Sequence, residues 1–376
     1  MSGDGESFES LDVADGGVPN VNPGVNPNPD ANANPDPDPD PDPDANPGAN
    51  PNPNLGANVN PGACARRSRW RAFAELVRAP AALSVPGDVL VGAAASGGLP
   101  RGREVALPVA SVCLYWAGMA LNDYADRDLD AKERPERPIP SGRISPGEAL
   151  ATAAGLTAAG VALGAWAGGR RRLPAVLGLA GAVWMYDLVL KGTPAAPTGM
   201  ALARGLDVMV GARPGLPGGL ADAAGCAGVV ALHTYGVTAL SRHEVHGTTP
   251  GPPAAALATA AATSFAAGAV GRRRRAGWGA PGGPGTRGGA RWDRAGAASV
   301  SGAGLAGYLA AYGRPLVRAI GDPRVGTVRA AVGGGVLGLL PLQAALLSRL
   351  GRPHAALVLS AAWPGARALA KVVSPT

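Results

Sequence analysis

The sequence predicts an all-α integral membrane protein, and three observations lead to this fold class. Apolar runs of about 17–21 residues recur from residue 79 onward, each long enough to cross a bilayer as a helix. Ala, Leu, Gly and Val dominate these runs, and small residues of this kind favour close packing of helices in lipid. Few polar residues interrupt the runs, which disfavours the alternative of a soluble all-helical protein.

The apolar runs give ten candidate membrane spans. They lie at residues 81–99, 105–122, 149–168, 173–190, 197–212, 221–240, 252–270, 298–312, 326–348 and 353–372. The run at 298–312 is the shortest and also fits a helix lying along the membrane interface. Nine or ten spans are therefore expected, as in a multi-pass protein of the cell membrane.

Two stretches of low complexity stand apart from these runs. Residues 1–65 hold 11 acidic residues, no Lys or Arg, and an Asn/Pro/Asp repeat with little apolar content. Such a segment cannot bury enough surface to fold, so a disordered, extended tail is predicted. It lacks the basic and apolar regions of a secretory signal. Residues 271–297 are rich in Gly and Arg and are predicted to form a loop insertion.

The acidic residues after the tail are concentrated in one short stretch. The chain has 27 acidic residues, of which 16 follow residue 65, and six of these lie between Asp123 and Glu136. Within this stretch, Asn122, Asp126 and Asp130 are four residues apart and would share one face of a continuous helix.

Carboxylates stacked in this way repel one another unless a cation lies between them. Mg²⁺ prefers oxygen ligands and is often held by one or two carboxylates together with substrate phosphates. We therefore expect Mg²⁺ and a polyphosphate at Asn122, Asp123, Asp126 and Asp130. A solvated acidic loop and a regulatory Ca²⁺ or Mg²⁺ site without phosphate are the alternatives.

Counting spans places three polar loops on the same side of the membrane as the N-terminus. The loops at 123–145, 186–192 and 241–247 each follow an even number of predicted spans. Lys and Arg residues flank the first two spans on this side, which predicts that these loops and the N-terminus are cytoplasmic. Arginines at 170–172 and 272–275 fall on the opposite side and argue against this orientation.

Two basic residues are candidates to contact a polyphosphate. Lys191 is the lone base of the second loop, although a lysine there can also extend to the membrane interface. Arg204 lies within an apolar run, where an unpaired charge is costly and a functional role is the usual explanation. A structural ion pair with Asp207 is the alternative for Arg204.

The acidic stretch continues into R-P-x-R-P-I-P-S-G-x-I at residues 134–144. The two patterns in this order resemble the UbiA superfamily of membrane prenyltransferases. The resemblance implies about nine transmembrane helices around a central cavity, over residues 75–373. It also implies that Mg²⁺, held by two Asp-rich motifs, binds an isoprenyl diphosphate, which ionises and is attacked by a lipophilic acceptor.

The resemblance also assigns roles to individual residues. Asn122, Asp126 and Asp130 match the first Asp-rich motif of the family, and Tyr186 to Lys191 resemble its Y-x-x-x-L-K segment. Catalytic roles are thereby implied for Asp126, Asp130 and Lys191. Contacts with the diphosphate are expected from Lys191, Tyr186, Arg204 and Arg242.

The sequence departs from the family at the loop after the sixth span. Where members carry a second motif of the form D-x-x-x-D, residues 241–246 have one carboxylate, Glu244. Glu244 is a candidate metal ligand, but the neighbouring imidazoles suit Mg²⁺ poorly. Arg242 is an alternative source of positive charge, and a solvated loop remains a further alternative. This pattern resembles a branch of the family with a degenerate second motif.

Two functions follow from these observations. The first is Mg²⁺-dependent transfer of a prenyl group to a lipophilic acceptor of aromatic or quinone-precursor type, with release of pyrophosphate. The second is a UbiA-like membrane protein that binds or transports an isoprenoid or another lipid without turnover. Membrane lipid is an expected partner and nucleic acid is not, while the sequence does not indicate an oligomeric state.

Overall fold

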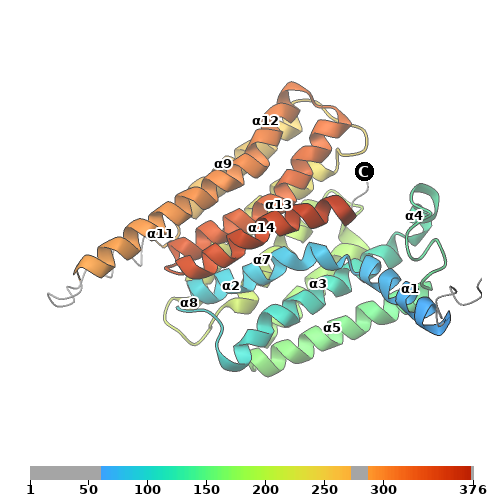
Figure 1. Ribbon diagram of the computed structural model, residues 1–376, viewed down its shortest axis with the longest axis horizontal. Helices are drawn as coiled ribbons and strands as arrows, with labels where there is room; N and C mark the ends of the chain where they lie inside the picture. The colour runs from blue at the N-terminus through green and yellow to red at the C-terminus, as the bar shows by residue number, and fades with distance from the viewer. Residues whose placement is uncertain (1–60, 272–286, 374–376) are drawn as a thin grey trace, which may run out of the picture. The chain divides into compact units, whose positions relative to one another are not determined.

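A computed structural model describes residues 61–271 and 287–373, and these residues form helices and no strands (Figure 1). The predicted all-α class is thus confirmed. Among the described residues, five helical segments have the length and hydropathy needed to cross a membrane. They are Gly102–Ala125, Pro146–Gly168, Leu173–Leu190, Gly219–Ser241 and Val325–Arg349. Length and hydropathy therefore support a multi-pass protein, but not the predicted count of nine or ten spans.

The first half of the described chain contains the helices that position the acidic stretch. They are α1 (Pro61–Leu76), α2 (Val85–Ala95), α3 (Ala106–Ala125), α4 (Arg127–Glu133), α5 (Pro146–Gly168), α6 (Leu173–Met185), α7 (Ala196–Gly211) and α8 (Gly219–Ser241). Helix α3 packs along α5, and α7 packs along both α8 and α2. Helix α5 begins with a capping box, in which Glu148 N donates to Ser145 Oγ over 3.2 Å.

The second half packs around one long helix. Its elements are α9 (Gly251–Ala269), α11 (Arg287–Tyr308), the π-helical turn η5 (Leu309–Gly313), α12 (Arg314–Gly321), α13 (Val325–Arg349) and α14 (Pro353–Val373). Helix α13 contacts α11, α14 and α8, and most of its C-terminal half is buried (Figure 1). The two halves meet where α13 and α8 share one apolar core.

Three predicted boundaries differ from the observed ones. Helix α1 begins at Pro61, inside the predicted tail, and α11 begins at Arg287, inside the predicted insertion. Arg and Ala have high helix propensity, which explains why a basic, Ala-containing segment continues as helix. The run at 298–312 is accordingly part of a longer helical segment. Residues 1–60 and 272–286 lie outside the described part of the chain, so their predicted disorder stays a prediction.

Helices α2 and α7 cross so closely that glycine is required at both contact points. A Cβ atom at Gly92 would lie 1.8 Å from the carbonyl oxygen of Val208, and one at Gly211 would lie 2.0 Å from that of Val89. Side chains of any size would push the two backbones apart. Small residues thus allow the close helix contact that lipid-embedded bundles favour.

Replacing Gly92 with alanine is expected to destabilise the protein by about 1–3 kcal/mol, because overpacked sites force backbone shifts. The matched control is Gly155→Ala on α5, where an added Cβ would meet nothing within 4 Å. That control is expected to stabilise the helix by up to about 1 kcal/mol. Thermal unfolding in detergent measures both effects, and equal effects of the two substitutions would contradict this account of the crossing.

Candidate functional site

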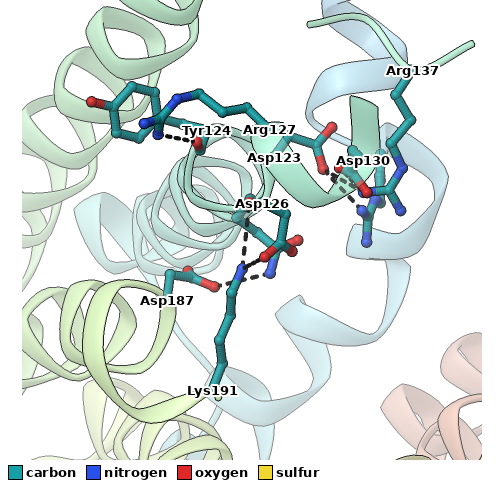
Figure 2. A network of polar contacts seen from close by, with 10 residues as sticks. Asp123, Tyr124, Asp126, Arg127, Asp130, Arg137, Asp187 and Lys191 are labelled. Carbon is teal, nitrogen blue, oxygen red and sulfur yellow. Dashed lines mark hydrogen bonds and ion pairs between the residues drawn. The ribbon is translucent and has the colours of Figure 1, made fainter. Parts of the chain in front are cut away.

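The acidic stretch lies where α3 gives way to α4. Backbone hydrogen bonds continue through it, since Asp126 N donates to Asn122 O over 2.9 Å and Asp130 N to Asp126 O over 2.8 Å. Asp126 itself has φ −90° and ψ 0°, outside the helical range, and α4 starts anew after it. The acidic side chains consequently separate into two groups instead of sharing one face (Figure 2).

The first group combines the end of α3 with the loop after α6. The Nζ atom of Lys191 lies 2.6 Å from Oδ1 of Asp126 and 3.4 Å from the carbonyl oxygen of Asn122. The Asn122 amide donates to Oδ1 of Asp187 over 3.2 Å. Two segments that are more than 60 residues apart thus meet through four polar side chains (Figure 2).

A π-helical turn presents two of these side chains. The turn η4 (Tyr186–Leu190) follows α6 directly, and Lys191 N donates to Tyr186 O over 2.9 Å. Turns of this type are rare in helices and frequent at functional sites. Gly118 of α3 lets α6 come close just before the turn, because a Cβ there would lie 2.9 Å from Cγ1 of Val183. Asp187 is buried, and Tyr186 is half-buried beside Gly199 of α7.

The second group is held by arginines. Asp123 is 4% exposed and pairs with Arg78 at 3.0 Å and Arg137 at 3.4 Å. Arg137 also pairs with the buried Asp130 at 2.6 Å. Asp123 and Asp130 thus face arginines in this structure, and their role as metal ligands beside Asp126 stays a prediction. Within residues 61–271 and 287–373, no three carboxylate, imidazole or thiol side chains lie close enough to hold a metal ion.

The loop after α8 approaches the first group through Arg242 but not through Glu244. The Nη1 atom of Arg242 donates to the carbonyl oxygen of Thr193 over 3.3 Å, two residues beyond Lys191. Burial raises the pKa of the half-buried Glu244, while Arg329 and Arg134 lie close enough to oppose this shift. Glu244 thus has arginines as neighbours, and metal ligation by Glu244 stays a prediction.

Arg204 lies within the bundle and is already paired. Its Nη2 atom lies 2.7 Å from Oδ2 of Asp88 on α2, so its ion pair is with Asp88 and not with Asp207, the partner that the sequence suggested. The Asp207 carboxylate nevertheless lies close enough to interact with both Arg204 and Asp88. Asp88 also accepts a hydrogen bond of 2.7 Å from Gln343 of α13. Asp207 accepts one from Ser111. Arg204 therefore joins two helices, and a contact with diphosphate would require it to leave Asp88.

Sequence reasoning missed three residues of this site. Asp187 lies four residues before Lys191, inside the segment already singled out, so its spacing was a usable signal. Arg137 lies in the basic, Pro-rich run, but nothing local indicates that it pairs with Asp123 and Asp130. Arg78 is the one non-glycine residue with positive φ in the described part of the chain, at 46°. Its local sequence gives no sign of this conformation.

Comparison with known proteins gives a family match for the part of the chain that carries the acidic stretch and the π-helical turn. Residues 89–241 match the model of the UbiA prenyltransferase family. Residues 89–241 belong to this family. The UbiA segment contains the acidic stretch, the π-helical turn and Arg204, and it ends at the loop that carries Arg242 and Glu244.

Curated relatives of the UbiA segment are synthases by name. Digeranylgeranylglyceryl phosphate synthase of Natronomonas pharaonis is 43% identical over 96 residues, which cover 25% of this chain and 35% of that protein. Chloroplastic chlorophyll synthase of Oryza sativa subsp. japonica is 36% identical over 117 residues, 28% of this chain and 31% of that protein. The chain thus matches only about a third of the length of these two relatives.

A solved structure extends the likeness beyond the UbiA segment. A structure described as giving insights into the biosynthesis of digeranylgeranylglyceryl phosphate synthase in membranes has a TM-score of 0.54 at 14% identity. The likeness covers 76% of this chain and 99% of that one. At this identity the comparison shows the fold alone, and it confirms that the helices are arranged as in a UbiA-type bundle.

The first group of side chains fits the divalent metal ion that the UbiA fold implies. Asp187 is 5% exposed, yet it accepts one amide hydrogen bond and makes no ion pair within 4 Å among the described residues. A buried carboxylate in this state is costly unless a cation compensates it. Asn122, Asp126 and Asp187 offer only oxygen ligands, which is the donor set that Mg²⁺ prefers.

Proposed function

We propose that the protein transfers a prenyl group from an isoprenyl diphosphate to a lipophilic acceptor, with Mg²⁺ held by Asn122, Asp126 and Asp187. The observation that carries this proposal is the meeting of Asp126, Asp187 and Lys191 at one end of the helices (Figure 2). Opposite charges at the same point are suited to a metal-bound diphosphate. The family match and the names of the relatives support prenyl transfer.

The side chains of this group have separate tasks in the proposed reaction. Asn122, Asp126 and Asp187 would hold the metal ion, which when bound would offset the charge that develops on the leaving diphosphate. Lys191 exchanges its contact with Asp126 for a diphosphate oxygen and adds a fixed positive charge, which is most effective in a site that excludes water. Arg242, held at Thr193, is positioned to add a second such contact. No side chain acts as a covalent nucleophile.

Arg137 and Arg78 act on this site indirectly. By pairing with Asp123 and Asp130, they fix the break between α3 and α4 and keep these two acids from repelling the diphosphate. The end of the helices that carries these residues faces the cytoplasm in our proposal, as the basic residues around the first two spans favour.

The acceptor is proposed by class. The names of the relatives point to acceptors as different as a glyceryl phosphate lipid and a chlorophyll precursor. Aromatic and quinone-precursor acceptors fit the same reaction. What these molecules share is a lipophilic body, which agrees with a site at the end of membrane helices.

The experiment uses the full chain, purified in detergent, with labelled geranylgeranyl diphosphate and Mg²⁺. Release of pyrophosphate is measured across a panel of a quinone precursor, an aromatic acid, a porphyrin and a glyceryl phosphate lipid. Turnover with at least one of them is expected. Binding of the diphosphate without release across the panel would instead favour the alternative, a non-catalytic lipid-binding or transport protein, which the single carboxylate of the 241–246 loop motivates.

Replacing Glu244 with glutamine is expected to change the Mg²⁺ concentration needed for diphosphate binding by less than about twofold, because Glu244 lies among arginines and not at the metal site. Asp187→Asn is the matched comparison and is expected to raise that concentration by at least about tenfold. Titration with Mg²⁺ at a fixed concentration of labelled diphosphate measures this requirement in both variants. If the required Mg²⁺ concentration rose equally in both, Glu244 would be a metal ligand.

A further inference from the structure

At the end of the bundle opposite the acidic stretch, arginine side chains link the loops between the helices. Helix α3 runs from this end, near residues 102–105, to the acidic stretch at its other end. Arg213, after α7, donates to the carbonyl oxygens of Gly98 and Leu99 over 2.9 and 3.0 Å. Arg352, between α13 and α14, donates to Gly97 O over 3.0 Å. Three loops that are far apart in the sequence therefore lie side by side.

The charge of this end is strongly unbalanced. The segments 96–105, 169–172, 212–222 and 349–352 together hold eight arginines and two acidic residues. The arginines are Arg101, Arg103, Arg170, Arg171, Arg172, Arg213, Arg349 and Arg352, and the acids are Glu104 and Asp222. Among these described segments, positive charge is thus in excess at one edge of the bundle.

Four of the eight arginines have structural tasks. Arg172 and Arg213 pair with the same carboxylate, Glu104, at 2.9 and 2.6 Å. Arg172 also donates to Ala212 O over 2.7 Å. Arg349 donates to carbonyl oxygens at the C-terminal end of α9, and Arg352, the fourth, donates to Gly97 O. These bonds satisfy carbonyl groups that every helix leaves unpaired at its C-terminus. The carboxylate of Glu104 is thereby already shared and cannot neutralise further arginines.

The other four arginines remain at the surface. Arg101, Arg103, Arg170 and Arg171 are exposed and form no ion pair with any described residue. Arg103 reaches the loop that carries Arg170 and Arg171, since a Cβ at Gly169 would lie 3.8 Å from its Nη2 atom. Positive charges gathered at one edge repel one another unless anions are present. Their placement at a membrane boundary is marked by Trp166, which is 60% exposed one turn before the loop at 169–172. Exposed Trp residues at helix ends are typical of the interface with lipid headgroups.

We propose that Arg101, Arg103, Arg170 and Arg171 form a binding surface for the phosphate groups of anionic phospholipids, in the leaflet opposite the acidic stretch. A guanidinium group matches a phosphate with two parallel hydrogen bonds. Phosphatidylcholine carries the same phosphate, but its trimethylammonium group offsets the negative charge, so exposed arginines at headgroup level favour lipids whose net charge is negative. The excess of positive charge supplies the electrostatic attraction. This surface is separate from the proposed diphosphate site, which lies at the other end of α3.

The test compares lipid binding by the delipidated full-length protein in detergent, measured by native mass spectrometry. Phosphatidylglycerol, phosphatidylcholine and inorganic phosphate are titrated separately. The wild type is expected to prefer phosphatidylglycerol over phosphatidylcholine. The variants R101Q/R103Q and R170Q/R171Q are each expected to weaken phosphatidylglycerol binding roughly five- to tenfold.

The matched control removes the same charge elsewhere. R314Q/R318Q changes two exposed arginines of α12 and is expected to leave phosphatidylglycerol binding unchanged. The proposal is overturned if the wild type shows no preference for phosphatidylglycerol, or if the control weakens its binding as much as the two test variants do. Inorganic phosphate that displaces the lipid at equal concentration would likewise exclude a lipid headgroup as the ligand.

Discussion

Replacing Asp126 with alanine is expected to abolish Mg²⁺-dependent binding of an isoprenyl diphosphate, with a loss of affinity of at least about 100-fold. Asp126 is the carboxylate that contacts Lys191, at 2.6 Å. Its removal takes a proposed metal ligand away and leaves Lys191 without the group that orients it. Equilibrium binding of labelled geranylgeranyl diphosphate, with and without Mg²⁺, measures the effect.

Asp128 provides the control for this substitution. It lies two residues away in α4, its side chain is 87% exposed, and its one ion pair is a long contact of 3.6 Å with Arg127. Asp128→Ala removes the same charge from the same stretch and is expected to leave diphosphate affinity within about twofold of the wild type. If Asp126→Ala bound diphosphate normally, the metal site would not lie at Asp126. If Asp128→Ala lost affinity equally, overall negative charge would explain the effect.

The contacts of Lys191 could be anticipated from the sequence because they depend on topology. An even number of predicted spans precedes each polar loop, which requires Lys191 and Asp126 to emerge on one side of the membrane. The structure places them in contact. The approach of the Arg242 loop to Thr193 follows from the same counting.

The partition of the acidic stretch could not be anticipated from its spacing. The four-residue interval of Asn122, Asp126 and Asp130 predicts one face only if the helix continues, and the backbone of Asp126 interrupts it. Asp123 and Asp130, on the two sides of this interruption, pair with Arg78 and Arg137, which lie before α2 and after α4. Whether an arginine meets a carboxylate tens of residues away is decided by tertiary packing, which no local pattern encodes.

The same limit applies to Arg204 and its partner. An arginine in an apolar run predicts a partner, and the nearest acid along α7 is Asp207. The observed ion-pair partner, Asp88, is 116 positions away on α2, where the crossing at Gly92 and Gly211 brings the two backbones together. The glycine contacts that fix the crossing thus also fix which carboxylate Arg204 can reach.

Replacing Asp88 with leucine is expected to lower the free energy of unfolding by about 3–5 kcal/mol, because Arg204 would keep its charge in a buried site without its partner. Arginine cannot escape this cost by losing its proton. Gln343 would lose an acceptor as well, since its Nε2 atom donates to Asp88 over 2.7 Å. Chemical unfolding in detergent is the measurement.

The double variant Asp88→Leu/Arg204→Met distinguishes a buried ion pair from simple misfit of the new side chain. Asp88 is fully buried and the Arg204 side chain is 12% exposed, so both charges have been largely removed from water. Removing both charges relieves that desolvation cost. The free energy of unfolding of the double variant is therefore expected to exceed that of Asp88→Leu alone by about 2 kcal/mol or more. If the two substitutions were additive, the 2.7 Å contact would contribute no coupling energy, and Arg204 would be free to serve the diphosphate.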